Sequence, residues 1–144
     1  MLFGRKKRRI TRLLVVEDEP LVAFDNEHIL SDAGYEVVAT VDSVADAVGV
    51  LQSDRDVDLV LVDVSLSDGS GLEVARAART REVPVLFVTG SCPPEAAELA
   101  AGVLAKPYAQ RDLLAAIGVI EAGLAGKTTK RLPSGFRLFA APAG

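Results

Sequence analysis

The sequence predicts an α/β fold in which an open, five-stranded parallel sheet carries helices on both faces. Two observations support this class. Apolar segments of strand length alternate five times with segments whose apolar residues recur at helical spacing. The segment "VDLVLVD" (residues 57–63) is almost continuously apolar, as expected of a strand buried on both faces. Crossover connections between parallel strands are right-handed, which fixes where the helices lie.

The strand segments come in a clear order along the chain. "RLLVVED" is rich in valine and short enough for a buried strand, and "EVVAT" and "VDLVLVD" follow it. "VPVLFVTG" is the fourth strand, and the brief "VLA" is a fifth that Lys106-Pro107 ends. The predicted strands are residues 12–18, 36–40, 57–63, 83–90 and 103–105.

The helices are indicated by their end signals as much as by their apolar faces. Pro20 suits the first turn of a helix, and Gly34 is typical of a helix end. Ser43 or Asp42 can cap the second helix. The fourth follows a compact loop with two prolines, so we expect a short or mobile helix there. The predicted helices are residues 21–33, 42–53, 70–80, 93–102 and 109–124.

The composition fits one domain that folds without covalent help. Hydrophobic residues make up 49% of the 144 residues, which is enough for a core that needs no disulfide or structural metal. Cys92 is the single cysteine, so no internal disulfide can form, and a reducing compartment fits. No apolar run approaches bilayer length, and no signal-peptide segment follows the basic start. We therefore expect a cytoplasmic protein.

Charge divides the chain into three parts. Basic side chains gather in residues 5–12 and again in residues 127–137, whereas residues 13–126 hold 6 basic and all 20 acidic side chains. We therefore expect a basic tail over residues 1–11, a domain over residues 12–125 and a C-terminal tail over residues 126–144. An acidic domain is a poor nucleic-acid binder and a plausible cation binder. The tails could contact an anionic partner, cover the acidic surface or remain solvated.

Polar side chains stand at the end of four predicted strands. Glu17 and Asp18 end the first, Asp63 the third, Thr89 the fourth and Lys106 the fifth. In open parallel sheets, functional groups gather beyond the carboxyl ends of the strands, so these side chains should meet at one rim. Clustered carboxylates repel unless a cation lies between them, and an all-oxygen set without His or Cys suits Mg²⁺.

This set of side chains can carry out phosphoryl transfer. The Asp63 carboxylate could attack phosphorus to give an aspartyl phosphate, while Lys106, Thr89 and Mg²⁺ stabilise the phosphoryl oxygens. The open turn after Asp63 leaves room for a donor and offers the Ser65 backbone carbonyl to the metal. Taken singly, each acid could be a turn former or helix cap, and Lys106 a surface residue. Their joint occurrence at successive strand ends favours one site.

The motifs "VVEDEP", "VDVSLSDGSG", "VLFVTG" and "LAKPY" together resemble the receiver domain of two-component response regulators, over about residues 12–125. The resemblance implies a flavodoxin-like receiver fold with strand order 2-1-3-4-5, which places the first strand beside the third. It also implies that Asp63 is the phosphoacceptor for a histidine kinase or histidine phosphotransferase. It implies that Glu17 and Asp18 hold Mg²⁺ with the Ser65 carbonyl. It also implies that Thr89 and Lys106 detect the phosphoryl group and move the surface of the fourth helix, fifth strand and fifth helix.

The sequence departs from the family pattern at Val103. The family has Tyr or Phe three residues before the lysine as a switch coupled to the threonine, so an aromatic rotamer change at this position is excluded. The strand end "PVLFVTG" also resembles a divergent receiver subgroup with an "FATG"-like strand end, found in stress-response signalling.

We expect no output domain in the C-terminal tail, because residues 125–144 are too few for a DNA-binding or catalytic unit. The stretch "GFRLFAA" could dock on its own domain, on a second copy or on a partner, or it could be disordered. We expect no direct DNA binding, and a weak or phosphorylation-dependent dimer is conceivable. The sequence does not indicate the downstream target.

Three functions compete. The first is a single-domain response regulator that acts in a phosphorelay through protein contacts and catalyses only its own phosphorylation and dephosphorylation. The second is a degenerate receiver that works as a phosphorylation-independent interaction module, which Val103 keeps open. The third is a small Mg²⁺-dependent phosphatase of the haloacid-dehalogenase type, which would need a second acid where this chain has Ser65.

Overall fold

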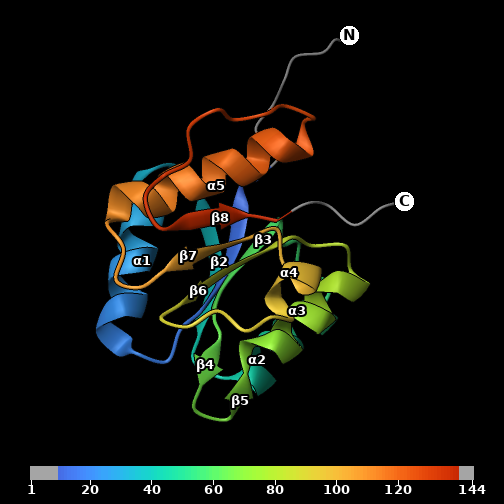
Figure 1. Cartoon of the computed structure of the whole chain (residues 1–144). Helices are drawn as coiled ribbons and strands as arrows, with labels where there is room; N and C mark the ends of the chain where they lie inside the picture. The colour runs from blue at the N-terminus through green and yellow to red at the C-terminus, as the bar shows by residue number, and fades with distance from the viewer. Residues whose placement is uncertain (1–9, 140–144) are drawn as a thin grey trace, which may run out of the picture.

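A computed structural model describes residues 10–139 (Figure 1). The sheet has six strands in the order β2-β1-β3-β6-β7-β8. The first five are parallel, which confirms the predicted order, and β8 runs antiparallel beside β7. The strands are β1 Arg12–Val16, β2 Glu36–Val41, β3 Leu59–Asp63, β6 Val85–Thr89, β7 Gly102–Ala105 and β8 Phe136–Leu138.

Helices cover both faces of this sheet (Figure 1). The helices α1 and α5 pack on one face over a core that includes Leu30, Leu113 and Ile117, and α2, α3 and α4 pack on the other over a core that includes Leu51 and Val74. The helices are α1 Pro20–Asp32, α2 Val44–Gln52, α3 Gly71–Thr80, α4 Ala96–Leu99 and α5 Gln110–Leu124. β3 and β6 are buried throughout, as the continuous apolar runs predict.

Several predicted helix ends are confirmed by the backbone. Pro20 opens α1, and Gly34 follows its end with φ at +98°. The Ser43 side chain caps α2 by accepting a hydrogen bond from the Asp46 amide. Four of the five helices lie within about two residues of the predicted ranges.

The fourth helix is the exception. The range 93–102 was predicted, but α4 spans only Ala96–Leu99. The two prolines stay in the loop before the helix, and Ala100 is already extended, because the chain must straighten to enter β7 at Gly102. The expectation of a short helix is therefore confirmed, and the predicted boundaries are wrong.

The turn after Asp63 contains structure that the sequence did not predict. A small antiparallel hairpin pairs β4 (Ser65–Leu66) with β5 (Gly69–Ser70). At its tip, Asp68 accepts hydrogen bonds from the Val44 and Ala45 amides at the start of α2. These bonds lower the pKa of the Asp68 carboxyl. The turn is thereby attached to a neighbouring helix.

The ends of the described chain are integrated into the domain. Ile10 is buried, and its amide donates to Glu121 on α5. The stretch "GFRLF" docks on its own domain as β8, which is one of the placements left open by the sequence. The basic residues 5–9 and the last two residues of "GFRLFAA" lie outside the described residues, and a function of either tail stays a prediction. Between residues 10 and 139, no helix has both the length and the apolar character needed to cross a bilayer.

Candidate functional site

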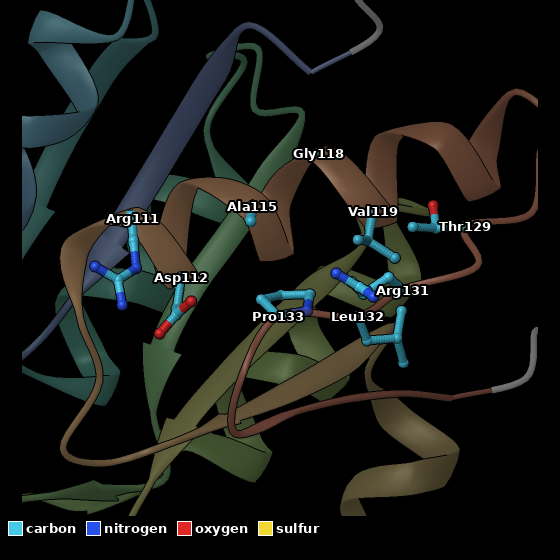
Figure 2. A pocket seen from close by; sticks show the side chains of 9 residues that line it. All are labelled: Arg111, Asp112, Ala115, Gly118, Val119, Thr129, Arg131, Leu132 and Pro133. Carbon is cyan, nitrogen blue, oxygen red and sulfur yellow. The ribbon is translucent and has the colours of Figure 1, made fainter.

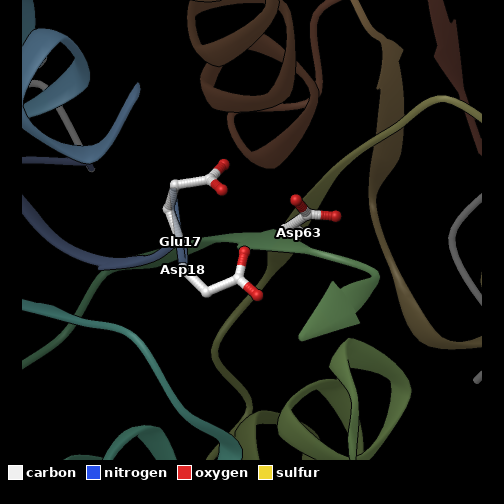
Figure 3. A group of neighbouring side chains, drawn as sticks. All are labelled: Glu17, Asp18 and Asp63. Atoms are coloured by element: carbon white, nitrogen blue, oxygen red, sulfur yellow. The ribbon is translucent and has the colours of Figure 1, made fainter. Parts of the chain in front are cut away.

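Three carboxylates meet where β1 and β3 end. In the parallel register Val16 pairs with Val62, so the chain places Glu17 beside Asp63 one residue further on. Each of Glu17, Asp18 and Asp63 offers an oxygen within 4.8 Å of the others, and Figure 3 shows the three side chains projecting from these two strand ends. The three acids, which were expected to meet at one rim, are thus brought together because β1 lies beside β3 in this register.

Lys106 supplies the positive charge that this cluster needs. It follows β7, and its Nζ lies 2.7 Å from Asp63 Oδ2 and 3.2 Å from Glu17 Oε1. The Glu17 and Asp63 side chains are only 1% and 10% exposed, so these ion pairs are poorly screened by water. The ammonium therefore bridges two acids that would otherwise repel each other.

Burial and charge shift the protonation of this group. Burial raises the pKa of Glu17, and the hydrogen bonds from the Glu19 amide and from Lys106 offset only part of that effect. Burial alone would lower the pKa of Lys106, but the hydrogen bond to Asp63 and the charges of Glu17 and Asp63 outweigh it and raise that pKa. Lys106 therefore remains an ammonium at neutral pH.

The backbone around Asp63 orients its carboxylate. The Ser65 amide donates to Asp63 Oδ1 at 3.0 Å, so both carboxylate oxygens have a donor. Gly71, the first residue of α3, donates its amide to the Val64 carbonyl at 2.7 Å. A Cβ at Gly71 would collide with the Asp63 carbonyl oxygen. Gly71 thus allows α3 to start directly against the strand end that carries Asp63.

Thr89 lies at the same rim, but its hydroxyl is engaged elsewhere. It ends β6, the neighbour of β3, and its backbone carbonyl accepts from the Lys106 amide at 2.9 Å. The Thr89 Oγ1 donates to the Ser91 carbonyl at 2.9 Å and accepts from the Ser91 amide at 3.0 Å. The structure therefore places Thr89 one residue beyond the partner of Asp63 in the β3–β6 register, while its side chain holds the loop that leads to α4.

The donor set fits Mg²⁺. Three carboxylates supply hard oxygen ligands, and the half-exposed Asp18 leaves one side open to solvent, as a hydrated Mg²⁺ requires. Glu17, Asp18 and Asp63 are therefore the residues that would hold the ion. The contribution of the Ser65 backbone carbonyl stays a prediction.

Val103 belongs to the core. It is 3% exposed and pairs with Phe87 on one side and Arg137 on the other.

Tyr108, which follows the Lys106-Pro107 dipeptide, was not predicted from the sequence as a site residue. Its hydroxyl donates to the buried Asn26 on α1 at 3.1 Å, and burial raises its pKa. This bond ties the loop behind Lys106 to α1. The sequence signal for this contact was the aromatic residue that follows Lys106-Pro107 in the motif "LAKPY".

The fold and site define a class of protein. The profile of the response regulator receiver domain family matches residues 13–118, and the chain belongs to this family. Receiver domains act in signalling, which agrees with an acidic cluster, a lysine and a threonine at the carboxyl ends of a parallel sheet.

Two regulatory proteins are similar to part of this chain. The chain is 37% identical to the phyllosphere-induced regulator PhyR of Methylorubrum extorquens over 81 residues, 55% of this chain and 30% of PhyR. It is 32% identical to the transcriptional regulatory protein PdtaR of Mycobacterium tuberculosis over 112 residues, 74% of this chain and 54% of PdtaR. The chain thus matches about a third to a half of the length of these relatives.

Solved structures support the same fold. A response regulator receiver protein from Sinorhizobium medicae superposes with a TM-score of 0.69 at 28% identity, covering 78% of this chain and 94% of that chain. A CheY-like receiver domain from Methanospirillum hungatei gives a TM-score of 0.73 at 25% identity, covering 81% and 98%. The receiver fold therefore extends over most of the chain.

Proposed function

We propose that this chain is a phosphorylation switch that accepts a phosphoryl group on Asp63 from a phosphohistidine, with Mg²⁺ held by Glu17, Asp18 and Asp63, and that it signals by protein contacts in a phosphorelay. The observation that carries the proposal is the position of Asp63. Its carboxylate is nearly buried, lies 2.7 Å from the Lys106 ammonium and stands beside two further acids. The donor would be a histidine kinase or a histidine phosphotransferase.

The transfer is an in-line displacement at phosphorus. An Asp63 carboxylate oxygen forms the new O–P bond as the P–N bond to the donor imidazole breaks, and the imidazole keeps the electron pair and takes a proton. The Ser65 amide and Lys106 hold the carboxylate in place. Mg²⁺, when bound, would supply positive charge to the phosphoryl oxygens. Hydrolysis of the aspartyl phosphate by water would return Asp63 to its free form.

A surface beside the site suits a donor protein. Leu21 and Phe24 on α1 are 79% and 66% exposed, although both are large and apolar. Next to them a cleft between α1 and the start of α5 is lined by Val22, Lys106 and Tyr108, among others. Large exposed apolar side chains beside a reaction centre favour contact with a protein. This surface supports delivery by a phosphohistidine protein.

Phosphorylation would change the contacts of Lys106 and Thr89. The Thr89 hydroxyl has one hydrogen, so it can donate to a phosphoryl oxygen only by giving up the Ser91 carbonyl. Lys106 would turn toward the phosphoryl group from its present partners, Glu17 and Asp63. Release of Ser91 would free the loop before the short α4. Activation would therefore reorder residues 90–105, because the phosphoryl group favours the state in which it is contacted. Unchanged amide-exchange protection of this segment on addition of beryllofluoride and Mg²⁺ would exclude this mode.

Intact mass spectrometry tests the proposal. The protein is incubated with acetyl phosphate and Mg²⁺, in parallel with Asp63→Ala and with the surface control Asp54→Ala. We expect one phosphoryl adduct, stable to acid and labile to base, on the wild type and the control and none on Asp63→Ala. No adduct on the wild type would indicate an interaction module that works without phosphorylation.

Three further expectations from the sequence stay predictions: a cytoplasmic location, membership of the subgroup with the "FATG"-like strand end, and a phosphorylation-dependent dimer.

A further inference from the structure

The C-terminal strand β8 covers the edge of the parallel sheet. It pairs with β7 in antiparallel register, with Leu138 opposite Gly102 and Phe136 opposite Leu104. Figure 1 shows it lying between β7 and α5. Without β8, the outer N–H and C=O groups of β7 would have no partner among the described residues. Such an edge is a ready template for another extended strand.

The two faces of β8 make different contacts. Phe136 is 6% exposed and belongs to the core under α5 that includes Leu113. Arg137, on the other face, stands opposite Val103, and its guanidinium lies 5.6 Å from the centre of the Phe139 ring. The C-terminal segment thus brings an aromatic and a cationic side chain to the face of β7 where the family's switch aromatic is replaced by Val103.

Both ends of β8 are hydrogen-bonded to the segment that would respond to phosphorylation. The Ala105 amide donates to the Gly135 carbonyl at 2.9 Å, and Ala105 directly precedes Lys106. The Phe139 amide donates to the Ala101 carbonyl at 2.9 Å, just after α4. A shift of Lys106 or of the α4 segment therefore acts on the two bonds that flank the β7–β8 ladder.

The connection to β8 is loosely packed. Residues 125–135 run from α5 back to β8 and leave an open cavity of about 440 Å³ against α5, lined by Ala115 and Val119 of the helix and by Thr129 and Leu132 of the connection, among others (Figure 2). Leu132 and Leu138 are 39% and 44% exposed. Of the three β8 side chains only Phe136 is buried, so its place in the core under α5 is the main side-chain contact that opposes the separation of this short strand. Short elements with few buried side chains are typical of segments that open locally.

We propose that β8 is a displaceable strand: phosphorylation of Asp63 releases it from β7, and the freed edge then binds an extended segment of a partner protein with an apolar–basic–apolar pattern. The inference rests on the proposed phosphorylation of Asp63. The C-terminal strand would thereby transmit the phosphorylation of Asp63 to the partner, a task for which Val103 lacks the family's aromatic ring. Release and phosphorylation are reciprocal, since each favours the other by the same factor.

The chemistry of the partner segment follows from what β8 fits. Close approach at Gly102 leaves no room for a side chain there, since a Cβ would lie 2.7 Å from the Phe136 ring and 2.8 Å from the Arg137 carbonyl oxygen. Beside the edge, an apolar cleft of about 580 Å³ is lined by Leu99, Ile120 and Leu124, among others. Two acids and one basic residue, Glu82, Glu98 and Arg79, also line this cleft, so its charge is net negative by one. Leu138 and Phe139 line it as well, so release of β8 would vacate apolar contacts there. Apolar side chains for the cleft and one basic residue for the acids are the complement of this surface.

A fluorescent peptide with the sequence of residues 133–139, PSGFRLF, serves as the probe. Its anisotropy is titrated with the full chain, with and without beryllofluoride and Mg²⁺, and a scrambled peptide is the control. Beryllofluoride should tighten peptide binding at least about tenfold, within the range of coupled sites. Phe136→Ala should bind the peptide without beryllofluoride, because its own β8 docks poorly. Gly102→Ala should bind it in neither condition, because the new Cβ obstructs the edge.

The outcomes separate this inference from the phosphorylation on which it rests. Fluorine NMR reports bound beryllofluoride, and circular dichroism reports the fold of both variants. Bound beryllofluoride without tighter peptide binding would overturn the inference and leave the switch intact. No bound beryllofluoride would count against the switch itself, and the Phe136→Ala titration would then decide alone whether the edge accepts a strand. Light scattering that shows a dimer from which the peptide is excluded would overturn the partner assignment in favour of β8 exchange between copies.

Discussion

The two halves of the sheet are built differently. In the half formed by β2, β1 and β3, long helices cover both faces, and the strand ends fix three acids within 4.8 Å of one another. In the half formed by β6, β7 and β8, α5 covers one face, but α4 on the other face has only four residues. Val103 stands at the position of the family's switch aromatic, and a three-residue strand closes the edge of the sheet. The first half holds Asp63, the proposed phosphoacceptor, with Glu17 and Asp18, the proposed Mg²⁺ ligands, and the second half holds Thr89 and Lys106.

The two halves of the sheet suit different tasks. Phosphoryl transfer needs its groups held in a fixed geometry, which well-packed strands provide. A switch needs a segment with two arrangements close in free energy, which a short helix and a small edge strand provide. The ion pairs of Lys106 with Asp63 and Glu17 join the two halves, so a change at the site reaches the second half through this residue.

The largest expected effect is on the packing of the first half. Gly71→Ala should lower the free energy of unfolding by about 3 kcal/mol, because its Cβ collides with the Asp63 backbone carbonyl. Gly49→Ala is the matched control: no atom lies within 4 Å of a Cβ there, and alanine should stabilise α2 by about 0.5–1 kcal/mol. Urea unfolding of both variants measures the contrast. Equal effects would mean that Gly71 is not a point of close approach.

The second largest effect is expected at the proposed Mg²⁺ ligands. Asp18→Asn removes one of three carboxylates and should weaken Mg²⁺ binding at least about tenfold, or about 1.4 kcal/mol. Asp54→Asn, on the surface away from the cluster, should leave it unchanged. Isothermal titration with Mg²⁺ compares the two. Similar weakening by both would show that bulk negative charge, and not the cluster, attracts the ion.

A smaller effect is expected at the start of β1. Asp58 accepts hydrogen bonds from Thr11 and Arg12, and these outweigh its burial and lower the pKa of its carboxyl. Since the folded-state pKa is depressed, this stability is present above the ordinary value of 3.8 and is lost as pH falls through the folded pKa. Asp58→Asn should lose about 1 kcal/mol at neutral pH and flatten the acid limb of the stability profile. Thermal unfolding across pH should show this, and an unchanged acid limb would contradict the assignment.

The smallest effect on stability belongs to the second half. Thr89→Ala should cost less than about 1 kcal/mol, because the Thr89 hydroxyl bonds only to the backbone of the exposed Ser91. Its phosphoryl adduct should still form, whereas the beryllofluoride response of residues 90–105 should be lost. Intact mass and amide exchange on the same sample measure both. A full response in this variant would show that Thr89 does not connect the site to α4.

Sequence reasoning succeeded where patterns are local and periodic. The apolar runs predicted β3 and β6, and the strand-end positions predicted that Asp63 would meet Glu17 and Asp18 at one rim. The strand order was implied by the family resemblance and is confirmed. It failed where a tertiary contact decides the structure. β8 forms because Gly102 lets Phe136 approach, and no period marks a three-residue strand. The role of Asp68 depends on a helix 23 residues away in sequence, and Thr89 bonds to Ser91 through a loop conformation that no motif encodes.

Amide exchange with mass-spectrometric detection tests the central claim most directly, in the presence and absence of beryllofluoride and Mg²⁺. The account predicts faster exchange in residues 90–105 and 136–139, with β1 and β3 unchanged, and no response in Asp63→Ala. Bound beryllofluoride with the response spread evenly over both halves of the sheet, or absent from α4 and β8, would contradict it.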